Sequence, residues 1–262
     1  MMKGLTLEEY SQKYQTCKFE REDGILQVTM HTKGEDLIWD FVTDEEIGFM
    51  LGDIGNDPEN KVIILTGTGE TFIDNEEFGK GPISPQVAGS HIYTYAKRLM
   101  NNYLNIPQPI ISAINGPATI HAEIGLLADI VLSSHDAVFQ DAPHFPNGLV
   151  PGDGVHVIWP MLLGFNQAKY FLLTGQKLSA QRLHELGVVH ELMPKKDLLP
   201  RAWEVARKIL EQPPLTVRLT REIINLEMKR RMNEDLPIGL MAELLGFTDY
   251  WPNEMKRPEG KI

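Results

Sequence analysis

The sequence has few of the residues that several common site chemistries need. It contains one cysteine, Cys17, which can form no disulfide within the chain and no cysteine cage for zinc. Basic residues are outnumbered, with 25 Lys and Arg against 36 Asp and Glu, so the net charge is −11. This balance disfavours nucleic-acid binding, which requires a basic face. The chain also lacks an apolar run of the roughly 18 residues that a membrane-spanning helix needs.

Several cofactor and nucleophile motifs are missing as well. No G-x-G-x-x-G loop, phosphate loop, G-x-S-x-G elbow or H-E-x-x-H helix occurs in the chain. His121 and Glu123 match half of the zinc deaminase motif, but the cysteine pair that completes it is absent. We therefore expect a chemistry that uses no cofactor and no metal.

The general features are those of a cytoplasmic globular protein. Residues 1–14 include Glu8 and Glu9 and no apolar stretch, so no signal peptide is predicted. Hydrophobic residues make up 42% of the chain, which is typical of a folded core. A length of 262 residues is compatible with a single core.

Short β-rich runs alternate with helical segments in the first half. Residues 25–30, 62–66 and 110–114 are predicted strands, and the last two are nearly continuous apolar runs, as buried parallel strands are. Thr43 and Glu46 have the spacing of a capping box, which predicts a helix from there to about residue 56. A longer helix is predicted over residues 87–105. This alternation predicts an α/β fold.

The second half is mainly helical. Predicted helices cover residues 166–174 and 179–186, with Gly175 and Gly187 as their terminators, and two amphipathic helices cover 197–212 and 215–234. The composition changes near Pro194. We therefore divide the chain into an α/β core, residues 1–195, and a helical C-terminal region, residues 196–262.

Three loops carry ionisable groups in otherwise apolar surroundings, at residues 115–123, 139–148 and 151–155. The first follows a buried strand, and such loops face the ligand crevice of α/β proteins. His144 and Asp153 lie nine residues apart across a turn, so the carboxylate could orient the imidazole as a general base. Alternatively, Asp153 caps the helix that begins near Val155, and the two roles are compatible.

Blocks spread over nearly the whole chain resemble the crotonase (enoyl-CoA hydratase/isomerase) superfamily. They are residues 62–69 with Phe72, 110–116, 123–130, Phe139, Pro143, 151–152, 172–175, Ala180 and 186–189. Their order and spacing make the resemblance specific. It implies a crotonase-like stacked ββα spiral core, a helical C-terminal region for oligomerisation, and a homotrimer or a dimer of trimers. It also implies two backbone N–H groups that form an oxyanion hole for an enolate.

At some positions the residues differ from those that hydratases carry. The glycine run that hydratases carry after the Asn-Gly pair is replaced by the bulkier residues 119–121, and residues 72–77 lack the small side chains of the first oxyanion donor. One hydratase acid matches Glu123, but the other is replaced by His144. These departures, with residues 37–39, 139–146 and 150–160, resemble the β-diketone hydrolase branch. By that resemblance the functional residues are Trp39, His121, His144, Asp153 and Glu243.

The resemblance implies hydrolysis of the carbon–carbon bond between the carbonyls of a cyclic or bicyclic β-diketone, a retro-Claisen reaction that yields a keto acid. His144, oriented by Asp153, would activate water. The carbon fragment that carries the second carbonyl would then leave the adduct as an enolate. Trp39 and His121 would donate N–H groups to the developing oxygen charge. Glu243 would position water or handle the proton, in its own or a neighbouring subunit.

Without the resemblance, Trp39 is better explained as a half-buried loop aromatic and Glu243 as a partly exposed helix residue. Glu123 is interpreted as structural. The histidines to which we assign no role are His31, His91, His135, His156, His184 and His190.

Two other functions stay open. A hydratase or isomerase of CoA thioesters would place a carboxylate where His144 stands. A non-catalytic RNA-binding homologue is disfavoured by the acidic charge. The expected partner is a small cyclic diketone, whose pocket residues 79–90 would line, with no nucleic acid and no membrane.

Overall fold

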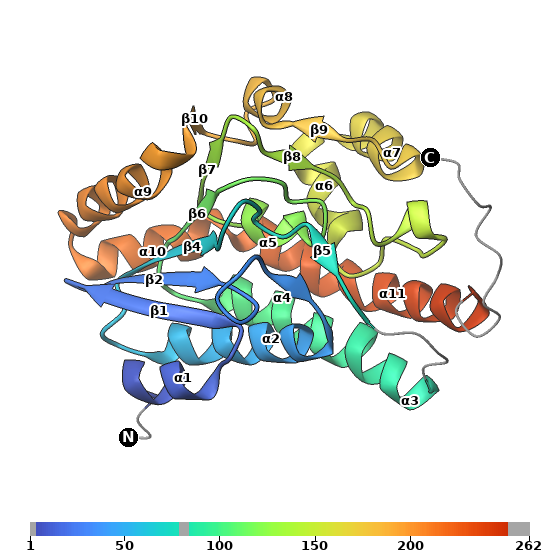
Figure 1. Cartoon of the computed structure of the whole chain (residues 1–262), viewed down its shortest axis with the longest axis horizontal. Coiled ribbons are helices and arrows are strands. Elements are labelled where there is room, and N and C mark those ends of the chain that lie inside the picture. Colours follow the sequence, from blue (N-terminus) through green and yellow to red (C-terminus); the bar gives the residue numbers. More distant parts are fainter. Residues whose placement is uncertain (1–3, 79–83, 251–262) are drawn as a thin grey trace.

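The computed structural model describes residues 4–78 and 84–250, and its centre is a six-stranded sheet (Figure 1). The strands lie in the order β1 (Cys17–Glu22), β2 (Ile25–Met30), β4 (Val62–Gly67), β6 (Ile110–Ile114), β7 (Ile130–Ser134) and β10 (Glu191–Met193). β1 and β2 form an antiparallel hairpin, whereas the other neighbours pair in parallel. The carboxyl ends of β2, β4, β6 and β7 therefore meet at one edge of the sheet, which is where α/β proteins bind ligands.

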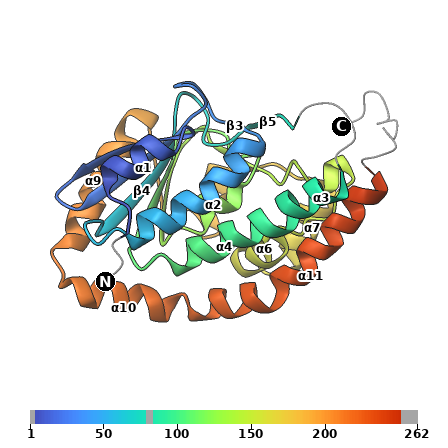
Figure 2. The same ribbon diagram turned by 90° about the horizontal axis from the view of Figure 1, so that it is seen from below.

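Helices cover both faces of this sheet (Figure 2). All six residues of β4 are buried, and alternate residues point to opposite faces. Ile63 and Leu65 join the core formed with α2 (Phe41–Asn56) and α4 (Ala96–Asn105). Val62 and Ile64 join a second cluster formed with α9 (Lys195–Leu210). A strand that is apolar on both faces requires this arrangement of helices, as its continuous hydrophobic run predicted.

Two short strand pairs accompany the main sheet: β3 (Ile38–Trp39) pairs with β5 (Asn75–Glu76), and β8 (Val138–Phe139) pairs with β9 (Leu178–Ser179). The remaining elements are α1 (Leu7–Lys13), α3 (Pro85–Ala88), the π-helix η1 (Gly89–Tyr95), α5 (Ala122–Leu126), the 3-10 turn η2 (Phe145–Asn147), α6 (Val155–Leu163), α7 (Phe165–Thr174), α8 (Ala180–Glu185), α10 (Pro214–Ile224) and α11 (Leu226–Tyr250).

The predicted strands and the α/β class are confirmed, but three helix predictions differ from the structure. α2 begins at Phe41, because Asp40 rather than Thr43 is its N-cap and accepts a hydrogen bond from the Thr43 backbone N–H at 2.8 Å. Glu46 does not complete a capping box there, because its carboxylate accepts hydrogen bonds from Gln15 and Thr16.

The second wrong prediction concerns the last helix. The segment predicted as one helix over residues 215–234 consists of α10 and α11, and α11 continues to Tyr250 with Pro237 inside it. The predicted helix over 87–105 is likewise composite, because η1 precedes α4. The boundary between residues 195 and 196 stays a prediction, and α9 packs directly on the sheet of the core.

The C-terminal helices are joined to the core through Arg221 of α10, which is 3% exposed. Its Nε donates a hydrogen bond to Asp129 Oδ2 at 2.7 Å, and its Nη1 donates to two carbonyl groups at the end of α4. Asp129 also accepts a hydrogen bond from Asn225, which lies between the two helices. These contacts fix the start of α11, the helix that carries Glu243. Within residues 4–78 and 84–250, no helix is both long and apolar enough to cross a membrane.

Candidate active site

The five residues assigned by resemblance come from five separate parts of the fold and form one buried cluster. The Trp39 and His121 ring centroids lie 4.2 Å apart. Asp153 Oδ2 lies 3.4 Å from His121 Nδ1 and 3.5 Å from His144 Nε2. Glu243 Oε1 of α11 lies 3.8 Å from the same His144 Nε2. The chain of contacts therefore runs from the end of β3 to the C-terminal helix.

His121 stands at the start of α5 in a left-handed backbone conformation, with φ of 45° and ψ of 42°. Residues other than glycine rarely adopt this conformation, which costs of order 1–3 kcal/mol and is concentrated at functional sites. Its Nδ1 lies 2.8 Å from Glu123 Oε1. Because a carboxylate only accepts hydrogen bonds, Nδ1 carries the proton. Glu123 therefore orients the ring, although the sequence interpretation left it as structural.

His144 lies between β8 and η2 and is 3% exposed. Its Nδ1 lies 2.6 Å from Asp141 Oδ1, three residues earlier in the same loop. Asp153 contacts the other ring nitrogen, Nε2, over a longer distance of 3.5 Å. The prediction that Asp153 would orient His144 is therefore corrected: the orienting contact at Nδ1 comes from Asp141.

The alternative reading of Asp153, as a helix cap, is also wrong. Helix α6 begins after Gly154, and no side chain caps its N-terminus. Asp153 is 4% exposed, and its Oδ1 has no hydrogen-bond partner among the described residues. Its carboxylate instead lies between the two imidazoles.

Burial and the neighbouring carboxylates act in opposite directions on the pKa values of the two histidines, and the carboxylates dominate. Burial alone would lower the pKa of His144, but the negative charges of Asp141 and Asp153 outweigh it and raise that pKa well above the ordinary value. For His121, the carboxylates of Glu123 and Asp153 overcome burial in the same way, and its pKa is also raised. Both imidazoles are therefore favoured as imidazolium ions.

The two carboxylates that face the imidazoles shift in opposite directions. Burial would raise the pKa of Asp153, but the two imidazoles stabilise its anion and hold the pKa well below the usual range. Burial dominates at Glu243 and raises its pKa to about 7, although His144 opposes the shift. Near neutral pH the site thus holds a permanent anion beside an acid that can give or take a proton.

Several buried polar atoms in the cluster have no hydrogen-bond partner among the described residues. They are Trp39 Nε1, Asp141 Oδ2, Asp153 Oδ1 and Glu243 Oε2. Buried polar groups in proteins are nearly always paired, so unpaired ones gathered at one place indicate a site that receives polar groups from a ligand. Trp39 Nε1 is a donor only, which suits an oxygen that gains negative charge.

Two glycines bring α11 onto the site. A Cβ atom on Gly152 would lie 2.2 Å from the Gly239 carbonyl oxygen and 2.7 Å from Glu243 Cβ. A Cβ atom on Gly239 would lie 2.1 Å from His156 Cε1 and 2.5 Å from the Gly152 carbonyl oxygen. The backbones therefore touch where no side chain fits, and this contact places Glu243 over His144.

Sequence reasoning missed two further contacts between a carboxylate and an imidazole. The Asp141–His144 spacing of three residues was visible, but only the loop conformation brings the two side chains together. His91 was assigned no chemical neighbour, yet its Nδ1 lies 2.9 Å from Asp44 Oδ2. Burial raises the pKa of Asp44, and the nearby histidines only partly offset this effect.

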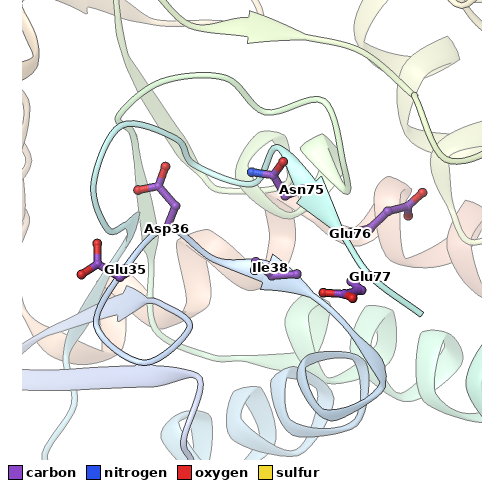
Figure 3. Close-up of a pocket in the computed structure, with 6 residues that line it drawn as sticks. All are labelled: Glu35, Asp36, Ile38, Asn75, Glu76 and Glu77. Atoms are coloured by element: carbon purple, nitrogen blue, oxygen red, sulfur yellow. The ribbon is translucent and has the colours of Figure 1, made fainter. Parts of the chain in front are cut away.

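A surface depression lies at the paired strands β3 and β5 (Figure 3). Its lining residues are Glu35, Asp36, Ile38, Asn75, Glu76 and Glu77. Four of the six are carboxylates, and these would repel an enolate or a carboxylate product. Of the residues predicted to line the pocket, 79–83 lie outside the described part of the chain, and 84–90 comprise Ser84, helix α3 and the start of η1.

The cluster also contains two overlapping sets of groups that could hold a metal ion. His144, Asp153 and Glu243 form one set, and His121, Glu123 and Asp153 form the other, each with its ligand atoms within 4.8 Å of one another. Protons compete for the imidazole nitrogens, because the surrounding carboxylates raise both histidine pKa values.

The family model described as enoyl-CoA hydratase/isomerase matches residues 20–254. The chain belongs to the enoyl-CoA hydratase/isomerase family. The short-chain-enoyl-CoA hydratase of Clostridium acetobutylicum is 28% identical over 214 residues, which cover 81% of this chain and 80% of the relative. The crystal structure of an enoyl-CoA hydratase from Bacillus anthracis is 27% identical, with a TM-score of 0.74, and the match covers 89% of this chain and 90% of that one.

A second kind of family member is more similar. A β-diketone hydrolase from the cyanobacterium Anabaena sp. PCC 7120, solved with bound (S)-3-oxocyclohexyl acetic acid, is 41% identical with a TM-score of 0.89. The match covers 94% of this chain and 99% of that chain. These matches confirm both the crotonase-like α/β fold and the resemblance to the β-diketone hydrolase branch of the family.

Proposed function

We propose that this protein hydrolyses a carbon–carbon bond between the two carbonyls of a cyclic or bicyclic β-diketone and releases a keto acid. The observation that carries the proposal is the buried Asp153 carboxylate shared by two imidazoles, with Glu243 beside one of them. Water activation at one imidazole and N–H donation from the other are the two functions that this reaction requires.

In the proposed reaction, the neutral form of His144 takes a proton from water at Nε2, and the hydroxide adds to one carbonyl carbon. Its separations of 3.5 Å from Asp153 and 3.8 Å from Glu243 are too long for direct hydrogen bonds and suit a water molecule held among the three groups. The adduct then collapses, the electron pair of the carbon–carbon bond forms an enolate with the second carbonyl, and the first carbonyl becomes the carboxylic acid.

The enolate must be stabilised and then protonated at carbon. Trp39 Nε1 and the His121 Nε2–H of the imidazolium are donors that no carboxylate of the cluster uses. Glu243, with its pKa raised to about 7, holds a proton in part of the molecules near neutral pH and can give it to the carbon. The proton that His144 Nε2 took from water then passes to the Glu243 carboxylate, 3.8 Å away, and restores both groups. The atoms then balance: one water is consumed and one keto acid is formed.

The Anabaena relative supports the choice of substrate class, because its bound ligand is a keto acid. Rejoining the carboxyl carbon of that ligand to a ring carbon next to the ketone gives a bicyclic β-diketone. We infer that a bicyclic β-diketone whose carbonyls flank one bridgehead carbon is the first substrate to test. The net charge of −11 on the present chain also favours a neutral substrate, because it opposes the binding of an anionic CoA thioester.

The test is a panel of monocyclic and bicyclic β-diketones incubated in isotopically labelled water. One labelled oxygen is expected in the carboxylate of the keto acid, and His144→Ala is expected to abolish turnover. His135→Ala, a matched change at an exposed histidine outside the site, should leave turnover unchanged. Efficient hydration of crotonyl-CoA without diketone cleavage would instead assign the chain to the CoA-thioester activity of its other relatives.

We also propose that the chain assembles as a homotrimer or a dimer of trimers, as the resemblance implies. Large apolar side chains are exposed on α10 and α11: Leu215, Leu219, Ile223, Ile224, Leu226, Ile238 and Leu245. Such a surface on one protomer favours burial against a partner. Light scattering after size-exclusion chromatography tests this proposal, and a monomeric mass would contradict it.

A further inference from the structure

Asp141 is a buried carboxylate with a single hydrogen-bond partner among the described residues. It is 6% exposed, its Oδ1 lies 2.6 Å from His144 Nδ1, and its Oδ2 has no partner. A carboxylate buried for structural reasons gathers several donors, as Asp129 does with Arg221, Asn225 and a backbone N–H. Burying a carboxylate with one partner is unfavourable, so its presence points to a role on that partner.

The loop that carries Asp141 does not depend on this side chain for its conformation. The backbone N–H of Ala142 donates to the Thr119 carbonyl oxygen at 3.0 Å, and that of Leu149 donates to the His144 carbonyl oxygen at 3.0 Å. The Asn147 side chain donates to the Ala142 carbonyl oxygen at 2.8 Å. Before Asp141, the Gln140 backbone N–H donates to the Ala118 carbonyl oxygen at 3.4 Å, so the loop is held on both sides of Asp141 by other groups.

We propose that Asp141 is the positioning residue of His144: it holds a proton on Nδ1 and so directs Nε2, the nitrogen that loses its proton when the ring becomes neutral, toward Asp153 and Glu243. The consequence for catalysis rests on the proposed function, but the state of the imidazole can be measured without any substrate. Asp153 then has no orienting role at Nδ1 and faces the nitrogen at which water is deprotonated.

The charge of Asp141 also sets the proton affinity of the base. An anion at this distance favours the imidazolium form, and one such neighbour typically shifts a pKa by about 1–3 units. The other titratable groups that face His144 are Asp153 and Glu243, and beyond Asp153 lie His121, Glu123 and His156. Removing the charge of Asp141 while these groups stay in place isolates the contribution of Asp141 to the His144 pKa.

The experiment uses nuclear magnetic resonance of the protein labelled with isotopic nitrogen in its histidine rings, with His144 assigned by the signal lost in His144→Gln. In the wild-type protein, Nδ1 of His144 is expected to carry the proton when the ring is neutral. In Asp141→Asn, the His144 pKa is expected to fall by about one unit or more. Asp141→Glu, which keeps the charge, is expected to restore most of the shift.

Kinetics supply a readout that a purely structural role would not move. In Asp141→Asn, kcat for diketone cleavage is expected to fall by about 10²-fold or more while KM changes little, because Asp141 contacts Nδ1 of His144 and not Nε2, the nitrogen proposed to activate water. The acid limb of the pH profile is expected to move to lower pH together with the His144 pKa. Asp197→Asn, the same chemical change at an exposed position on α9, is the matched control and should change none of these quantities.

Two results would overturn the proposal: a wild-type His144 whose neutral ring is protonated on Nε2, or an Asp141→Asn variant in which the His144 titration and the pH profile are unchanged. The wild-type spectrum decides the first point even if Asp141→Asn fails to fold. Absence of diketone cleavage in the wild-type protein would reject the proposed function alone, because the ring measurements do not depend on it.

Discussion

The contact between Gly152 and Gly239 determines how closely α11 approaches the site, and Gly152→Ala tests its importance. A Cβ atom at residue 152 would lie 2.2 Å from the Gly239 carbonyl oxygen, about 1.2 Å closer than the 3.4 Å at which ordinary contact begins. Both neighbours of the new methyl group belong to α11, one of them the main chain. The methyl group therefore displaces α11 rather than a flexible side-chain end.

The size of the effect follows from this displacement. Glu243 lies on the displaced helix 3.8 Å from His144 Nε2, and a shift of about 1 Å at a reacting group costs roughly 10²-fold in rate. Overpacking of this kind typically costs about 1–3 kcal/mol of stability. We therefore expect kcat/KM for diketone cleavage to fall by about 10²-fold in a protein that remains folded at room temperature.

The assay compares Gly152→Ala with Gly246→Ala, the same substitution elsewhere on α11. A Cβ at Gly246 would meet Val150 Cγ2 at 3.4 Å, an ordinary contact, so this control should keep full activity. Denaturant unfolding of both variants separates the loss of rate from the loss of stability. Wild-type kcat/KM and unfolding free energy in Gly152→Ala would refute the idea that this close contact positions Glu243.

Three further predictions concern the base, the helical anchor and the indole donor. Because the His144 pKa is raised above 6.5, kcat/KM should be lost as pH falls through that raised value, and an acid limb below 6.5 in a pH–rate profile would contradict it. Arg221→Ala leaves Asp129 buried without its cation, so denaturant unfolding should show a loss of about 3–5 kcal/mol, against little change in Arg218→Ala on the same helix. Trp39→Phe keeps the ring but removes the N–H donor, so kcat should fall about 10²–10³-fold without unfolding, and full turnover would exclude this donor.

The elements of the core could be predicted from local sequence. Nearly continuous apolar runs identified β4 and β6, because a strand with helices on both faces has no polar face. Helix ends were harder, since neighbouring polar residues offer equivalent caps: Asp40 and Thr43 both suit the start of α2, and packing selected Asp40. Pro237 predicts a break in α11, but the docked helix continues through it.

The composition of the site was available in the sequence, but its geometry was not. Motif resemblance identified Trp39, His121, His144, Asp153 and Glu243, because residue types at matching positions are properties of the chain alone. Which carboxylate touches which imidazole nitrogen depends on loop conformation and on the approach of α11, both of which are set by contacts between distant segments. Only the tertiary structure therefore decides that Asp141 holds Nδ1 of His144, that Asp153 lies between the two rings, and that burial raises the pKa of Glu243 to about 7.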